Sequence, residues 1–518
     1  MTLIAATSPA TGAIQGRRQE VASEDDGQGV YDRHLKKKTR NSIIWTVIRL
    51  TSNQFFAFAV FVVLARLLNP HDIGIFAIVT LFSEFARILA NGGLTNYIVR
   101  ARKLTPELLD TIFWGNMALA VFVSALVIAL ANPVLNAIGQ PLAVGPMMVV
   151  GSLLPIVAAG ASHMALRLRE FGHKSMAVRS MLSGALGGGA AIAAAFAGWG
   201  IWSLVVQRVV TEIVNTLVSW QAYNWRPGRK FAFDSLREMW GFSSNIAITQ
   251  IIFLFLTRVQ DLVVGATIGA VAVGIYRTAW RMTELITNGA IQPFTQVAVQ
   301  TFSRLQDNRA DLIKAYRGMV FASSTISFPA LVGFGIIARD AVPVVYGPQW
   351  HEAGYLAQIF ALMVVPFSLN YFVSPVLSAI GRGSDMRWLA TLQLFLTLGL
   401  TILAAPFGIA AVAWAYVGRA YLTFPLQLWL LKRRAGIGFG TTFGATAAPF
   451  AASLVMGAGV WLFMWFARPL MESELLFVAA AVGVGIPLYG GALLVLSGQS
   501  RQLLMRQVRK RLGIGRAE

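Results

Sequence analysis

The sequence contains no cysteine, so disulfide bonds, thiolate metal sites and thiol nucleophiles are excluded. Charged residues are also scarce. They make up 13% of the 518 residues, whereas a soluble globular domain carries about 25%. The five histidines are scattered without the spacing of a metal site, and the chain has no GxxxxGK(S/T) loop that would bind nucleotide phosphates. These absences give no reason to expect a metal centre, an organic cofactor or a catalytic residue.

Hydrophobic residues are what the sequence has in excess. They account for 56% of the chain, and the mean hydropathy is +0.63. A helix that crosses a bilayer needs roughly 20 mostly apolar residues, and such stretches recur along the chain. We therefore predict an all-α polytopic membrane protein with about 14 transmembrane helices. The predicted spans are 42–68, 75–98, 111–131, 144–166, 181–197, 200–220, 242–266, 277–299, 318–338, 355–379, 388–405, 408–430, 443–466 and 475–497.

The basic residues alternate between the loops that these spans define. Of the 43 Lys and Arg residues, 33 fall in one set of alternate loops and tails, and three fall in the other. The positive-inside rule then predicts a multi-pass membrane protein with both termini in the cytoplasm. We expect 1–41 to be a disordered basic tail and 498–518 a second basic tail. The net charge of +20 thus serves orientation and contact with anionic membrane lipids, not nucleic acid.

Two stretches of the chain repeat each other at an offset of 200 residues. Gly74 and Glu84 correspond to Gly274 and Glu284. Loop rhythm and span lengths match as well, which predicts two pseudo-symmetric six-helix bundles around a substrate site. We assign the bundles to 42–222 and 241–431, and assign 443–497 to two additional, peripheral transmembrane helices.

Four acidic residues lie inside predicted spans, and each has an arginine one helical turn away. The pairs are Glu84–Arg87, Arg208–Glu212, Arg258–Asp261 and Arg281–Glu284. Such spacings put both members on one helix face, so mutual neutralisation is one interpretation. Charges inside a membrane are costly and often functional. We hypothesise that the repeated Glu84 and Glu284 bind protons or a cation, or form alternative ion pairs, as the halves rock, with transport coupled to H⁺, Na⁺ or the membrane potential. We expect Glu212 and Asp261 to form ion pairs.

Three further arginines inside the spans have no acid nearby. We expect Arg66 to reach the outer interface, while Arg49 and Arg419 lie deeper. Seven intramembrane arginines then face four acids, which favours an anionic substrate with an apolar tail because guanidinium binds phosphate bidentately. The predicted pyrophosphate ligands are Arg49, Arg87, Arg258, Arg281 and Arg419.

Four segments in order give the chain a resemblance to a known family. They are RLLNPHDIGIFAIV (66–79), GLTNYIVRARKLTPELLDTIFWGN (93–116), GWGIWSLVVQ (198–207) and DLVVGATIGAVAVGIYRTAWRM (261–282). The sequence resembles the polysaccharide transport family of lipid-linked oligosaccharide flippases, within the multidrug/oligosaccharidyl-lipid/polysaccharide exporter superfamily. The likeness covers about 42–440. Many relatives show an Asp-Arg order in span 7, whereas this chain has Arg258 before Asp261, which leaves the partner of Asp261 open.

The resemblance implies what the protein would move. The expected substrate is an undecaprenyl-pyrophosphate-linked oligosaccharide repeat unit, flipped to the outer leaflet by alternating access for exopolysaccharide, capsule or O-antigen synthesis. The polymerase and the chain-length regulator of the same pathway are expected partners. One alternative is an ion-coupled multidrug exporter of the same superfamily. Another is a membrane polymerase or glycosyltransferase, although the longest outer loop, 339–354, has only about sixteen residues for catalytic groups.

Overall fold

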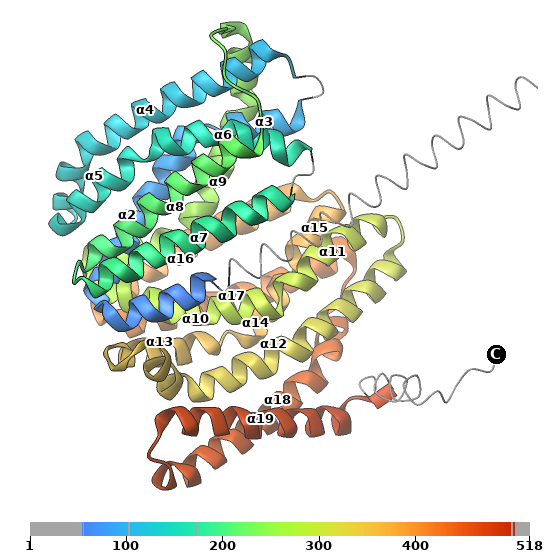
Figure 1. Cartoon of the computed structure of the whole chain (residues 1–518). Helices are drawn as coiled ribbons and strands as arrows, with labels where there is room; N and C mark the ends of the chain where they lie inside the picture. The colour runs from blue at the N-terminus through green and yellow to red at the C-terminus, as the bar shows by residue number, and fades with distance from the viewer. Residues whose placement is uncertain (1–53, 55, 102–103, 171–172, 499–500, 503–518) are drawn as a thin grey trace, which may run out of the picture.

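The computed structural model describes residues 54, 56–101, 104–170, 173–498 and 501–502 (Figure 1), and this part of the chain is helical without strands. The N-terminal half contains the helix Phe56–Leu67, α2 (Pro70–Asn91), α3 (Leu94–Arg100), α4 (Pro106–Ala137), η1 (Pro141–Ala143), α5 (Val144–Ser152), α6 (Leu154–Arg169), α7 (His173–Phe196) and α8 (Ile201–Ala222). The predicted tail 1–41, Arg49 and most of 498–518 lie outside the described residues.

The second half is longer and more often interrupted. It contains α9 (Phe233–Thr267), α10 (Ala270–Ala290), α11 (Gln292–Arg304), α12 (Arg309–Tyr346), η2 (Pro348–Trp350), α13 (His351–Ala361), α14 (Val364–Asn370), α15 (Val373–Ala379), α16 (Gly383–Ala404), η3 (Ala405–Phe407) and α17 (Ile409–Ala435). The chain then continues through α18 (Phe439–Ala467), η4 (Arg468–Leu470) and α19 (Glu474–Leu496).

Local sequence explains where several helices begin and end. Asn69 caps α2, because its Oδ1 accepts a hydrogen bond from the Asp72 amide at 2.8 Å, and Pro70 follows in the first turn. Thr105 caps α4 in the same way, with Pro106 next. Gly92, with φ 52°, ends α2 in the left-handed conformation that glycine adopts without strain.

In the described part of the chain, each predicted span coincides with a helix or a broken helix, and the part of the first span before residue 54 lies outside it. Within the described residues, ten helices are long and apolar enough to cross a membrane, or eleven if the bent pair Pro348–Ala361 and Val364–Ala379 crosses as one. The remaining predicted spans fall on Phe56–Leu67, α7 and α10, which are shorter or less apolar than the qualifying helices. The all-α polytopic fold is confirmed, while the count of 14 crossings stays a prediction.

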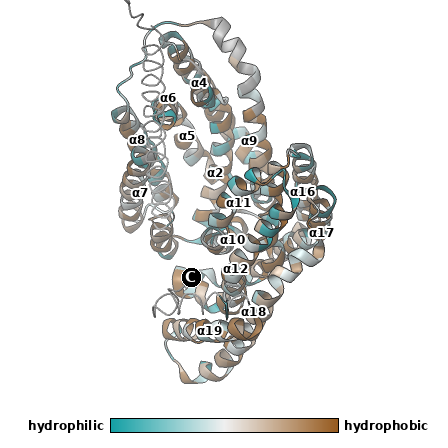
Figure 2. Cartoon of the chain, turned by 90° about the vertical axis from the view of Figure 1, so that its right-hand side faces the viewer, coloured by the Kyte–Doolittle hydropathy of each residue, from teal (hydrophilic) through white to brown (hydrophobic). Residues whose placement is uncertain are grey.

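The helices form three successive groups in space. Figure 1 shows the N-terminal half above, α10 to α17 in the middle, and α18 with α19 at the bottom. The halves meet where α2 packs along α10, and α9 packs against α2 on one side and α16 on the other. α18 and α19 pack on each other and on α12, and Figure 2 shows hydrophobic residues along both of them.

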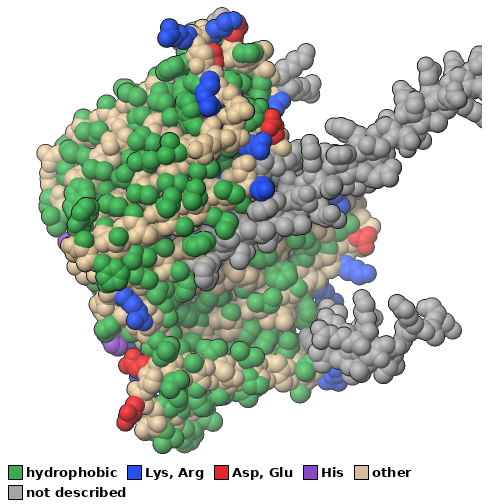
Figure 3. Space-filling model, viewed as in Figure 1, with side chains coloured by type: hydrophobic (Ala, Val, Ile, Leu, Met, Phe, Trp, Pro, Cys, Tyr) green, Lys and Arg blue, Asp and Glu red, His purple; other side chains and the backbone are tan. Residues whose placement is uncertain are grey.

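Interhelical contacts sort the loops to two ends of the molecule. At one end, here called the basic end, Arg169 donates to the Ile98 carbonyl, Lys230 pairs with Glu107, and Arg309 donates to the Ala435 carbonyl. At the opposite end, Trp350 donates to the Ala65 carbonyl and Arg468 pairs with Asp340. In Figure 3, lysine and arginine side chains gather mainly at the top and right-hand edges, around a broad hydrophobic face.

Candidate functional site

A cavity of about 410 Å³ lies between the two halves. From the N-terminal half it is lined by Gln54, Ala57, Phe58, Val60, Phe61, Leu64, Ile73, Phe76, Ala77, Thr80, Leu204 and Gln207. From the second half it is lined by Arg258, Arg277, Trp280, Arg281, Glu284, Leu285 and Asn288. The charged residues of the lining all belong to the second half, because each of them lies on α9 or α10.

α10 places most of these polar groups on one face. Arg277, Arg281, Glu284 and Asn288 recur at intervals of four, three and four residues, which align on one side of an α-helix. The lining thus has three arginines and one glutamate. Arg277 is a site residue that the sequence prediction missed. The predicted span 8 began at residue 277, whereas α10 begins at Ala270 and carries Arg277 inside the helix. Its helical spacing from Arg281 and Glu284 is the signal in the sequence that could have identified it.

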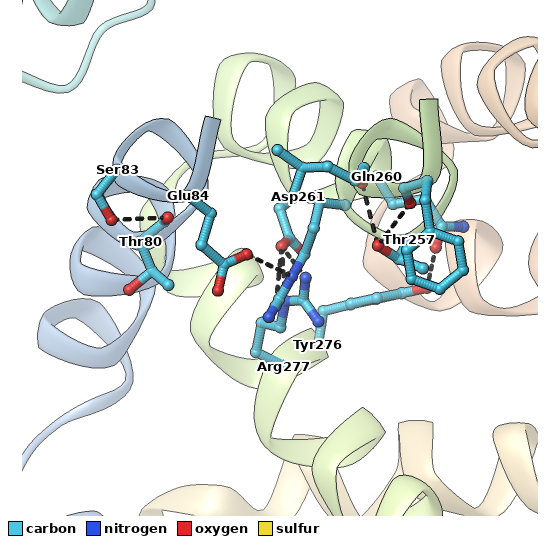
Figure 4. A network of polar contacts seen from close by, with 11 residues as sticks. Thr80, Ser83, Glu84, Thr257, Gln260, Asp261, Tyr276 and Arg277 are labelled. Carbon is cyan, nitrogen blue, oxygen red and sulfur yellow. Dashed lines mark hydrogen bonds and ion pairs between the residues drawn. The ribbon is translucent and has the colours of Figure 1, made fainter. Parts of the chain in front are cut away.

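Asp261 is the most deeply buried acid of the cluster, with a side chain 2% exposed. Arg277 donates to its Oδ2 through Nε at 2.6 Å and also through Nη2 (Figure 4). Arg258, one turn before Asp261, reaches the same oxygen through Nη1 at 3.8 Å. The predicted Arg258–Asp261 pair exists, but the principal partner of Asp261 is Arg277 on the next helix.

Glu84 does not pair with Arg87 as predicted. Its Oε2 instead lies 3.7 Å from Arg258 Nε, so the pair joins α2 of the first half to α9 of the second. Figure 4 shows Glu84 directed towards Asp261 and Arg277. Arg87 lies one turn further along α2 and lines a separate pocket of about 180 Å³. The spacing rule failed here because a partner on another helix lies closer.

The predicted pair of Arg281 and Glu284 is also absent from the described structure. Arg281 donates through Nη2 to the Ala57 carbonyl at 2.9 Å, and its guanidinium lies 4.0 Å from the centre of the Phe61 ring. Glu284 is exposed and lines the cavity without an ion pair to any described residue. Among the lining arginines, Arg281 is therefore the one that contacts no carboxylate of the described residues.

The remaining predicted charges lie elsewhere. Arg208 Nη2 and Glu212 Oε1 form the expected local pair at 3.0 Å on α8. Arg66, which we expected to reach the outer membrane–water interface, donates hydrogen bonds to the Val344 and Val345 carbonyls at the end of α12. Arg419 stacks 4.5 Å from the Tyr416 ring centre, and its buried Nε has no hydrogen-bond partner among the described residues. Arg66, Arg87, Arg208 and Arg419 do not line the cavity, so the surplus of arginine in its lining comes from Arg258, Arg277 and Arg281.

A polar chain behind the ion pairs ties α9, α10 and α16 together. Tyr276 donates its hydroxyl hydrogen to Gln260 Oε1 at 2.6 Å (Figure 4). Gln260 Nε2 donates to Thr401 Oγ1 at 3.4 Å. All three residues are buried or nearly so. Gln260 therefore serves interhelical hydrogen bonding, which fixes α9 next to the cavity.

The chain shares sequence and fold with known transport proteins. Residues 63–354 match the family described as "Polysaccharide biosynthesis protein". The succinoglycan biosynthesis transport protein ExoT of Rhizobium meliloti is 24% identical over 483 residues, 92% of this chain and 97% of that one. The lipopolysaccharide biosynthesis protein WzxC of Escherichia coli is 22% identical over 355 residues, 67% of this chain and 71% of that one.

Two solved structures share the arrangement of helices. The lipid II flippase MurJ in an inward closed conformation matches with a TM-score of 0.72 at 12% identity, covering 89% of this chain and 100% of that one. An inward-facing multidrug resistance transporter of the MATE family, in the same exporter superfamily, matches with a TM-score of 0.59 at 16% identity, covering 75% and 98%. The predicted exporter fold and family resemblance are confirmed, and this chain belongs to the polysaccharide biosynthesis protein family as a multi-pass membrane transport protein rather than an enzyme.

Proposed function

We propose that this protein flips an undecaprenyl-pyrophosphate-linked oligosaccharide from the cytoplasmic to the outer leaflet of a bacterial inner membrane. The single observation that carries the proposal is the position of Arg281 in a cavity between the two halves, without a carboxylate partner among the described residues. A pyrophosphate loses its hydration in a low-dielectric passage, and a fixed cation offsets that loss. The family match and the relatives in polysaccharide biosynthesis support the choice of a lipid-linked glycan.

Arg281 and Arg258 are the proposed pyrophosphate ligands. A guanidinium has five N–H donors, and one bond to Ala57 leaves most of those of Arg281 free. Arg258 is 30% exposed, and its two contacts with carboxylates are long, at 3.7 and 3.8 Å, so a phosphate oxygen competes for it readily. Arg277 is engaged at short range with buried Asp261 and serves to position α10.

The apolar tail of the substrate needs an apolar path outside the polar cavity. An apolar pocket of about 440 Å³ lies between α12, α18 and α19, lined by residues such as Pro329, Phe334, Met456 and Ile486. We assign part of the polyprenyl chain to this pocket. Alternating access then consists of rocking between the halves about the α2–α10 contact, driven by H⁺, Na⁺ or the membrane potential.

The experiment that tests this function uses purified protein in proteoliposomes. The probe is a fluorescent undecaprenyl-pyrophosphate-linked oligosaccharide, and an impermeant quencher reports the fraction in each leaflet. Wild-type protein is expected to equilibrate the probe. Arg281→Gln is expected to slow it at least tenfold, and Arg281→Lys nearly as much, because lysine lacks the bidentate fork.

Arg387→Gln is the matched control, because Arg387 is exposed and lines neither the cavity nor the pocket of Arg87. It is expected to behave as wild type. Full activity of Arg281→Gln would remove Arg281 from the site. Failure of the wild-type protein to move this probe, together with movement of a cationic dye, would instead favour multidrug export.

A further inference from the structure

A second polar pocket lies within the N-terminal half, next to the central cavity but distinct from it. Its volume is about 180 Å³, and it is enclosed by α2, α4, α6 and α9. The lining residues are Arg87, Ile88, Ala90, Asn91, Asn116, Leu154, Val157, Ala158, Ala161 and Gln250. One guanidinium and three carboxamides therefore share a small space that is otherwise apolar.

The polar groups of this pocket are left largely unsatisfied by the protein. Asn116 is 1% exposed, and its Oδ1 has no hydrogen-bond partner among the described residues. Arg87 makes neither a hydrogen bond nor an ion pair with the described part of the chain. Asn91 accepts one bond from Thr95 at 2.8 Å through its Oδ1, which leaves its amide N–H groups for another partner. Buried amides are normally paired, so an orphan beside a free guanidinium indicates that a ligand completes the set.

The combination of groups selects a class of ligand. A guanidinium binds a carboxylate through two parallel hydrogen bonds. Carboxamides both donate and accept, as neighbouring sugar hydroxyls do. The apolar walls from Leu154, Val157 and Ala158 on α6 leave room for the C–H face of a sugar ring. An acidic sugar residue satisfies all three features at once.

The pocket lies along the route from the central cavity. Thr80 lines the cavity, Glu84 follows one turn later, and Arg87 and Asn91 continue the same face of α2. From Thr80 to Arg87 the helix rises by roughly 10 Å. α9 repeats the relation, since Arg258 lines the cavity and Gln250 lines the pocket. A glycan whose pyrophosphate is in the central cavity therefore has a path along α2 to this pocket.

We propose that the pocket of Arg87, Asn91, Asn116 and Gln250 is a glycan subsite that binds an acidic sugar residue of the transported repeat unit. This inference rests on the proposed flippase function and adds substrate selectivity to it. It separates Arg87 from the pyrophosphate ligands with which the sequence had grouped it. The central cavity then recognises the anchor shared by all such lipids, and the second pocket recognises the sugar.

Binding to three synthetic lipids tests the subsite with the full-length protein in nanodiscs. The probes are undecaprenyl pyrophosphate, the same lipid bearing a neutral disaccharide, and the same lipid bearing that disaccharide with a terminal glucuronic acid. Wild-type protein is expected to bind the acidic lipid at least tenfold more tightly than the neutral one. Arg87→Gln is expected to abolish this preference and to leave the affinity for bare undecaprenyl pyrophosphate unchanged.

Gln250→Leu, on a different helix, gives an independent test. Its side chain is exposed, so its loss does not disturb packing, and it is expected to weaken both glycan lipids several-fold but not the bare lipid. Arg281→Gln should weaken all three equally, and Arg387→Gln none. Equal affinities of the wild type for the acidic and neutral lipids, or equal loss of all three in Arg87→Gln, would overturn the subsite alone. If the wild-type protein binds none of the three lipids, the proposed function itself is overturned.

Discussion

Gly74 of α2 and Gly274 of α10 lie against each other where the two halves of the molecule meet. A Cβ added to Gly74 would lie 3.0 Å from the Gly274 nitrogen and would overlap the Ala270 carbonyl. A Cβ added to Gly274 would lie 3.1 Å from the Gly74 nitrogen and would overlap the Pro70 carbonyl. The two residues are also the positions that match at the offset of 200 residues in the sequence. Only glycine permits this approach of the two backbones.

Gly274→Ala is expected to separate α2 from α10 and to destabilise the conformation described here. Overpacking of this kind costs about 1–3 kcal/mol, and thermal unfolding of the purified protein in detergent measures it. Gly289→Ala on the same helix is the control, because its Cβ would meet no atom within 4 Å. A melting temperature for Gly274→Ala equal to that of the control would show that the glycine contact is not maintained in detergent.

Arg277→Leu is expected to be one of the most destabilising single changes near the cavity. It leaves the Asp261 carboxylate, 2% exposed, without its short-range partner. Removing one member of a buried ion pair costs about 3–5 kcal/mol, whereas replacing both members by apolar residues is often neutral. The double variant Arg277→Leu, Asp261→Leu should therefore recover most of the melting temperature. No recovery would mean that the pair contributes through more than mutual neutralisation.

Glu84→Gln with Glu284→Gln is expected to stop transport while the protein still folds. Glu84 links α2 to Arg258 of α9, and Glu284 faces the cavity without a cationic partner among the described residues. The Glu84 carboxylate thus bridges the two halves, and we expect the Glu284 carboxylate to bind a proton or Na⁺. Polymer export in a strain that depends on this protein measures the effect. Full export at native expression would exclude both carboxylates from coupling.

Single cysteines test the orientation, and the absence of native cysteine makes the experiment clean. Lys230→Cys at the basic end should remain unlabelled by an impermeant thiol reagent in intact cells. Arg468→Cys at the opposite end should be labelled. Both positions are well exposed, at 72% and 68% of the side chain, so access to the reagent is equal apart from the membrane. The reverse pattern of labelling would show that the orientation in the membrane is opposite to the predicted one.

Much of the architecture follows from the sequence alone. Apolar length defines the helices, because a bilayer offers no partners to an unbonded backbone. The Asn69-Pro70 and Thr105-Pro106 pairs define where α2 and α4 begin, since capping depends on neighbouring residues only. The Arg208–Glu212 pair was predicted for the same reason, as both residues lie on one helix with no closer competitor.

The partners of the other charges were decided only by the tertiary structure. Glu84 lies nearer to Arg258 than to Arg87, and Asp261 bonds to Arg277 sixteen positions further along the chain. Helical spacing states which residues share a face, but not which face of another helix lies opposite it. Coulomb energy falls with distance and depends on burial, so the packing of α2, α9 and α10 selects the pairs. That packing leaves Arg281 in the central cavity and Arg87 in the second pocket without a carboxylate partner among the described residues, and the sequence could not tell these two positions apart.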